Sequence, residues 1–287
     1  MTWYNSEAGQ PGAEPTIRSA ERRTAGLMFV ALYGQFITHT WRATDSHSDA
    51  YSLFHQHSLA MGWLDDRGAG GGVEGSMTRA PGLWGMNDAG WHHPLVAPEL
   101  NLISWFQVEA SGVADDRPLP LRPFLRCAHD ASERAGSVRL SAVQLLAPVQ
   151  GLDAVRRPSY APFPSMMTTR WFSECEPNTA SLVEVCLSSG RSQIAAVATE
   201  LTDLLRELDQ DVFRLSATSW RSEIPPVPLA PSAWNGPAEK VLSLRGDLKE
   251  WTCEAIGWLA ELLADVVATL GLRAPLLVTV LKEKEPA

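Results

Sequence analysis

The sequence predicts a layered α+β protein with its helices on one face of the sheet. Short apolar runs typical of strands alternate with longer segments whose apolar residues recur at the helical period. Proline-rich segments separate these groups of elements. The chain has 287 residues, of which 45% are hydrophobic and 20% charged, as is ordinary for a globular protein with a sizeable core.

Three parts of the chain share the order strand, amphipathic helix, strand. They cover 102–110, 121–135 and 138–146; then 182–187, 192–208 and 212–218; and finally 240–244, a helix from 247 to about 270, and 276–281. In the last unit Asp247 is expected to cap the helix and Gly271 to end it. Each helix must bury one face on a sheet. We therefore expect about three strand–helix–strand units, ferredoxin-like in pattern, in one or two layered mixed sheets.

Proline-rich joints divide the chain. The joint at 156–165 predicts an N-terminal region, residues 1–155, and a C-terminal region, residues 156–287. The joint at 225–237 is expected to be a rigid connector, the alternative being a recognition motif for aromatic-lined grooves. Residues 27–37 are apolar enough for a buried strand or a helix, and periodicity leaves both open.

Composition argues against several classes of protein. The net charge is −9 and no basic patch carries interleaved aromatic residues, which excludes a typical nucleic-acid-binding surface. No apolar run reaches about 18 residues, so no membrane span is expected, and the first residues do not resemble a secretory signal. The four cysteines are scattered without a C-x-x-C motif, as suits free thiols, and we expect a cytoplasmic protein.

Histidine and tryptophan are concentrated near the N-terminus. Six of the seven histidines and four of the eleven tryptophans lie between residues 39 and 93. If residues 51–59 form a strand, His55 and His57 share one face, about 6–7 Å apart at Cα, where they can bind one metal ion. Further candidate ligands are His92, His93, Asp65 and Asp66. The alternative is that His55 and His57 are half-buried strand residues with local hydrogen bonds.

Other motifs carry little chemistry. The glycine-rich segment 67–85 formally contains G-x-G-x-x-G, but no strand precedes it and no helix follows it, so we expect a surface loop. A G-x-S-x-G serine-hydrolase motif is absent.

The helix expected from Asp247 carries an acidic arc beside two tryptophans. At the helical period the arc and its tryptophan border comprise Glu250, Glu254, Glu261, Asp265, Trp251 and Trp258. Acids flanked by indoles bind a cationic partner through charge and cation–π contact. The alternative is a solvated helix face whose tryptophans pack over the sheet.

Two functions from different classes follow from these patterns. The first is a cytoplasmic, non-catalytic binding protein, adaptor- or immunity-like, that presents the acidic, tryptophan-bearing helix surface to a protein partner. The alternative is a metal-dependent small-molecule enzyme with a site centred on His55 and His57 and a divalent metal such as zinc or iron. An oligomer is compatible with either function.

Overall fold

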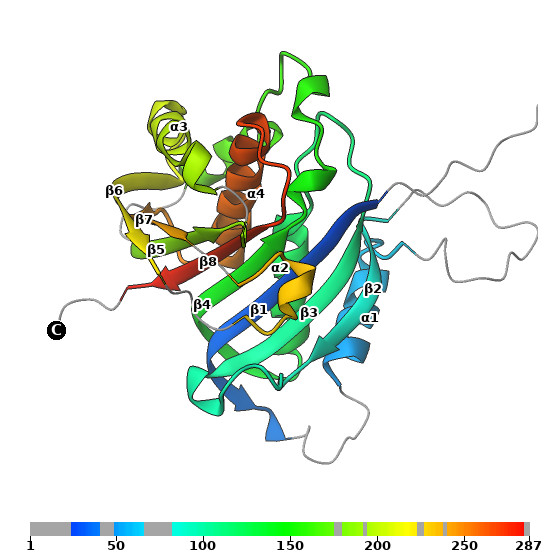
Figure 1. The fold of residues 1–287 in the computed structure, drawn as a ribbon. Helices are drawn as coiled ribbons and strands as arrows, with labels where there is room; N and C mark the ends of the chain where they lie inside the picture. Colours follow the sequence, from blue (N-terminus) through cyan, green and yellow to red (C-terminus); the bar gives the residue numbers. More distant parts are fainter. Residues whose placement is uncertain are drawn as a thin grey trace, which may run out of the picture.

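The protein, seen in a computed structural model, is built on one large sheet. The structure describes residues 24–40, 49–65, 82–174, 180–191, 194–222, 227–237 and 240–283. Eight strands form the sheet in the order β2-β3-β1-β4-β8-β5-β7-β6, and every pair of neighbours is antiparallel. The α-helices lie against one face of this sheet, as expected (Figure 1).

The order β-α-β-β-α-β occurs twice along the chain. The first half comprises β1 (Thr24–Thr38), α1 (Ala50–Ala60), β2 (Trp84–Gly90), β3 (Leu102–Ser111), α2 (Leu121–Glu133) and β4 (Gly136–Ala147). The second comprises β5 (Ser181–Ser188), α3 (Ile194–Glu207), β6 (Phe213–Arg221), β7 (Val241–Leu248), α4 (Cys253–Thr269) and β8 (Leu276–Lys282). The halves meet where β4 pairs with β8, so the sheet runs through both.

The predicted mixed sheet is wrong, because all strand pairs are antiparallel, and the expected pattern of three ferredoxin-like units is not confirmed. The three predicted strand–helix–strand segments are present, but β1–α1–β2 forms a fourth in the same sheet. Residues 27–37, which the sequence left open, belong to strand β1. The expected cap Asp247 lies in β7, and Thr252 caps α4 instead by accepting a hydrogen bond from the Ala255 amide at 3.2 Å.

Residues 51–59 form most of helix α1 and not a strand. Asp49 caps the helix by accepting a hydrogen bond from the Ser52 amide at 2.6 Å. Leu53 and Phe54 are buried in the main core beneath the sheet. The cap and this buried pair on one side of the helix explain why the segment is helical despite its alternating histidines.

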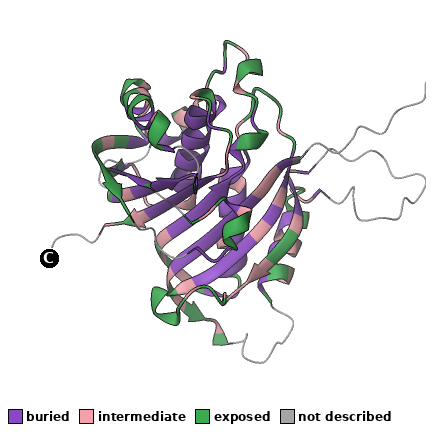
Figure 2. Cartoon of the chain, viewed as in Figure 1, coloured by how far each residue is buried: buried purple, intermediate pink, exposed green. Residues whose placement is uncertain are grey.

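Helix α4 lies at the centre of the helix layer. All residues from Ala255 to Ala268 are buried, and Figure 2 shows the helix enclosed by other elements. Its neighbours are the sheet, α2, α3 and the connection at 148–174, which contains the short helices η3 (Val149–Gly151), η4 (Ala154–Arg156) and η5 (Pro164–Glu174). A helix covered on several sides has no solvent-facing arc over most of its length.

The opposite face of the sheet is covered in part by the second proline-rich joint. Its described residues, 227–237, include the short helix η7 (Pro231–Ala233) and pass in front of β1 and β4 in Figure 1. Val227, Leu229 and Trp234 pack there against Phe29, Leu277 and other residues of the sheet. The joint is therefore part of a second, smaller core. Among the described helices, none combines the length and the apolarity needed to cross a bilayer.

Candidate functional site

The expected acidic surface on α4 is not present as a surface. Trp258 is fully buried, and its indole Nε1 donates a hydrogen bond to the Ser165 carbonyl oxygen at 2.8 Å. Glu261 and Asp265 are also buried. The prediction of a partner-binding arc through Trp258, Glu261 and Asp265 is wrong, because the connection at 148–174 covers Trp258 and Asp265 and the start of α2 covers Glu261.

Asp265 holds that connection in place. Its Oδ1 pairs with Arg157 Nη2 at 2.7 Å, and its Oδ2 accepts a hydrogen bond from the Ser165 amide at 2.8 Å. Burial raises the pKa of Asp265, and the Arg157 charge opposes that rise. The role that these contacts indicate is structural.

Glu261 is a second buried carboxyl group, one helical turn away. Its Oε1 accepts a hydrogen bond from the Arg122 amide at 2.8 Å, while Oε2 is buried and has no hydrogen-bond partner among the described residues. Burial raises the pKa of Glu261 to about 8, although the charge and the amide of Arg122 act against it. The group joins α4 to the start of α2 and is closed to a protein partner.

The start of α4 is only partly covered. Trp251 is half-buried, and its Nε1 donates to the Leu140 carbonyl oxygen at 3.1 Å. Glu254 pairs with Arg126 at 3.1 Å, and Glu250 accepts a hydrogen bond from Thr252 at 2.9 Å. Trp251 and Glu254 line a cleft described below.

The predicted metal site centred on His55 and His57 is not assembled. Residues two apart on a helix point about 200° apart, so the two imidazoles leave α1 in different directions. His55 stacks on Tyr51, with ring centroids 6.2 Å apart. His57 contacts Trp63 and approaches Asp130, with Nε2 3.4 Å from Oδ2. The shared face that the strand interpretation required does not exist.

The remaining predicted ligands lie elsewhere. Asp65 is buried and accepts a hydrogen bond from Ser111 at 3.0 Å. His93 accepts a hydrogen bond from the Leu95 amide at 3.2 Å and contacts Trp105, whose Nε1 donates to the His92 carbonyl oxygen at 2.9 Å.

His92 and His93 lie between β2 and β3 and form no site with His55 and His57. The two residues line a separate pocket of about 560 Å³. Burial lowers the pKa of His93, and Asp88 opposes this. Asp66 and most of the glycine-rich segment lie outside the described residues.

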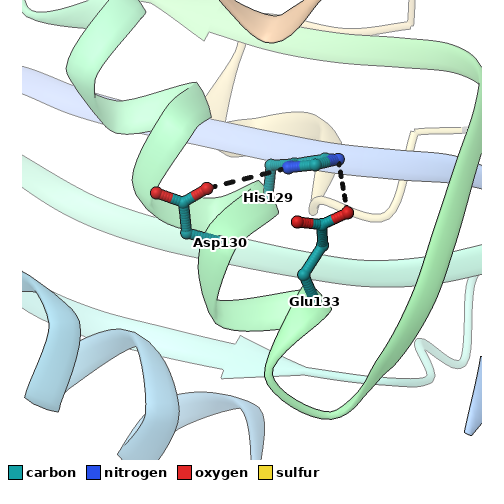
Figure 3. A group of neighbouring side chains, drawn as sticks. All are labelled: His129, Asp130 and Glu133. Atoms are coloured by element: carbon teal, nitrogen blue, oxygen red, sulfur yellow. Dashed lines mark ion pairs between the residues drawn. The ribbon is translucent and has the colours of Figure 1, made fainter.

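A different set of side chains converges on the polar side of α2. One ligand atom from each of His129, Asp130 and Glu133 lies within 4.8 Å of the others (Figure 3). His129 Nδ1 is 3.8 Å from Asp130 Oδ1, and His129 Nε2 is 3.9 Å from Glu133 Oε1. In the part of the chain that the structure describes, this is the group of three His, Cys, Asp or Glu side chains whose ligand atoms lie close enough together to share a metal ion. We call it the α2 cluster.

Asp130 connects the α2 cluster to α1. Its Oδ2 is 3.4 Å from His57 Nε2 and 3.7 Å from Arg126 Nε, whereas its Oδ1 faces His129. Burial acts to raise the pKa of Asp130, but the hydrogen bond from His129 and the charges of His57 and Arg126 outweigh it and lower the pKa. Asp130 is therefore an ionised carboxylate with one oxygen held by His57 and Arg126.

A cleft of about 660 Å³ adjoins the α2 cluster. Its walls come from α2, the start of β4 and the start of α4, and comprise Arg126, His129, Asp130, Val138, Arg139, Leu140, Trp251, Thr252, Cys253 and Glu254. Burial raises the pKa of the Cys253 thiol, and Asp130 and Glu254 raise it further. At neutral pH Cys253 is thus a thiol and a poor nucleophile.

Sequence reasoning missed the α2 cluster. The available signal was the sequence H-D-x-x-E from His129 to Glu133, which places His129 and Glu133 one helical turn apart. This signal is short, and the cleft beside it is formed by elements that are distant in sequence.

Comparisons with known proteins add no further constraint on the site. No protein-family model, curated protein or solved structure matches the chain.

Proposed function

We propose that this protein is a metal-dependent enzyme acting on a small molecule, with a divalent ion bound by the α2 cluster. The observation that carries the proposal is the convergence of His129, Asp130 and Glu133 within 4.8 Å at the edge of a cleft. One imidazole and two carboxylates suit zinc or iron. Three protein ligands leave coordination positions for water and substrate.

The surroundings of Asp130 support a metal-binding role. His57 and Arg126 both approach Oδ2, which leaves Oδ1 directed toward His129. Partners that hold a ligand's outer atom orient it and are a regular feature of metal sites. His57, a residue predicted to be a ligand, would thus act by positioning Asp130.

The cleft supplies a place for a substrate beside the ion. A divalent ion at the cluster would act as a Lewis acid and would lower the pKa of a bound water. The chain's own residues would orient the substrate, with Trp251 and Leu140 as apolar contacts and Arg126 and Arg139 as polar contacts.

A second candidate is the non-catalytic, adaptor- or immunity-like binding protein. The net charge of −9 and the edge strand β6, on which Trp220 is 51% exposed, favour this function. An edge strand presents free backbone groups that can pair with a partner or with a second copy. The free cysteines Cys127, Cys186 and Cys253 support a cytoplasmic location for either function.

Elemental analysis of the full chain tests the metal proposal. After incubation with zinc or iron(II) and removal of free metal, the wild type is expected to retain about one ion per chain. The double variant His129→Ala/Glu133→Ala is expected to retain none. His55→Ala is the matched control, because His55 lies on α1 away from the cluster, and should keep the metal.

Two outcomes would overturn the metal proposal. One is a wild-type protein that retains no ion. The other is retention of the ion by the double variant.

A further inference from the structure

The cleft beside the α2 cluster is lined by an aromatic side chain and by two cationic ones. Trp251 and Leu140 are apolar residues of this lining, and the hydrogen bond from Trp251 Nε1 to the Leu140 carbonyl oxygen fixes the indole. Lys282 Nζ lies 6.0 Å from the centroid of the Trp251 ring. The indole is therefore held in one orientation at the cleft before any ligand binds.

The acidic groups of the cleft already have cationic partners. Glu254 pairs with Arg126 at 3.1 Å and with Arg122 at 3.9 Å. Asp130 is paired with His57 and with Arg126. Glu254 and the Oδ2 atom of Asp130 are therefore already paired with cations of the protein.

Arg139 is the second arginine of the cleft. It lines the cleft, is exposed, and forms no ion pair or side-chain hydrogen bond with any residue that the structure describes. Arg139 therefore offers a positive charge in the same cleft as the fixed indole of Trp251, although the chain as a whole has a net charge of −9. A guanidinium group with free donors binds a carboxylate in a bidentate fashion.

We infer that this cleft binds a small aromatic acid, with its planar body against Trp251 and Leu140 and its carboxylate on Arg139. The cleft volume of about 660 Å³ accommodates a molecule of one or two fused rings. The inference deepens the proposed function and rests on it for the ligand's role as substrate. Binding itself depends on Arg139 and Trp251 and not on the metal.

Calorimetric titration of the metal-free full chain with 2-naphthoate tests the inference. Arg139→Gln is expected to bind 2-naphthoate at least tenfold more weakly than the wild type, because one charge-assisted contact is lost. Arg134→Gln is the matched control, because Arg134 is exposed at the end of α2 and does not line the cleft. The neutral analogue 2-naphthalenemethanol should bind the wild type and Arg139→Gln equally.

The inference is overturned if the wild type does not bind 2-naphthoate, or if Arg139→Gln binds it as the wild type does. Glu133→Ala separates the two proposals, because Glu133 belongs to the α2 cluster but does not line the cleft. Loss of metal by this variant with unchanged naphthoate binding supports both. A wild type that binds naphthoate but no metal contradicts the proposed function alone. Stoichiometric metal with no effect of Arg139→Gln contradicts the ligand inference alone.

Discussion

Arg156 and Arg157 are neighbours in the sequence but lie in opposite environments. The Arg156 side chain is 66% exposed and pairs with Asp153, whereas that of Arg157 is 4% exposed and pairs with the buried Asp265. Arg157→Ala leaves a buried carboxylate without its partner and is expected to lower the free energy of unfolding by about 3–5 kcal/mol. Arg156→Ala removes an exposed pair and should cost less than about 1 kcal/mol. Denaturant unfolding measures both, and equal losses would contradict the assigned role of Arg157.

Glu261 makes stability depend on pH. Its folded pKa of about 8 lies above the value of about 4.3 for an unfolded chain. Between these values the unfolded chain releases the proton and the folded chain keeps it, so stability falls as pH rises. Glu261→Gln retains an acceptor for the Arg122 amide and cannot ionise.

The Glu261→Gln variant should therefore lose less thermal stability than the wild type between about pH 5 and pH 8. Thermal melts across this range measure the difference. Glu200→Gln, at an exposed position of α3, is the control and should follow the wild type. Parallel profiles for Glu261→Gln and the wild type would show that Glu261 does not titrate in this range.

At the scale of elements, α1 depends on its cap. Asp49→Ala removes the acceptor for the Ser52 amide and is expected to cost about 0.5–2 kcal/mol, whereas Asp49→Asn, which keeps a capping oxygen, should cost much less. Unfolding of the two variants measures the difference. An alanine variant as stable as the asparagine variant would mean that the cap does not hold α1.

The elements that the sequence predicted correctly are those with a strong helical period and clear ends. Helix α2 and the strands on either side of it lie within two residues of the expected bounds, and Gly271, with φ +88°, ends α4 as expected. The metal site considered at residues 51–59 required a strand, which two alternating histidines fit, but the segment forms helix α1. The cap at Asp49 and the adjacent apolar pair Leu53 and Phe54 favour a helix.

The candidate site was less predictable for a physical reason. The i, i+4 spacing of His129 and Glu133 is visible in the sequence, but its significance depends on His57, Trp251 and Arg139. These come from α1, α4 and β4, and only the folded chain brings them together. The burial of Trp258 was equally hidden, because it depends on where the connection at 148–174 crosses α4.

The whole molecule is organised around a continuous sheet. Residues 142–147 of β4 pair with 276–281 of β8, and α2 packs against α4, so both contacts cross the predicted boundary between residues 155 and 156. Separation of the regions would expose two sheet edges and a buried helix face. The division into residues 1–155 and 156–287 remains a prediction, and we do not expect the two regions to unfold separately.

We expect the chain to unfold in a single calorimetric transition whose calorimetric and van't Hoff enthalpies agree. A destabilising variant in one half, such as Arg157→Ala, should lower the one transition as a whole. Two resolved transitions, of which only one responds to the substitution, would show that the halves are independent.

The proposed function depends on a metal ion bound at the α2 cluster. The most direct measurement is anomalous X-ray diffraction from crystals of the full chain soaked in zinc. We expect an anomalous peak within coordination distance, about 2.0–2.2 Å, of one nitrogen of His129 and one oxygen each of Asp130 and Glu133. Absence of a peak at these residues, or zinc bound elsewhere alone, would contradict the proposed function.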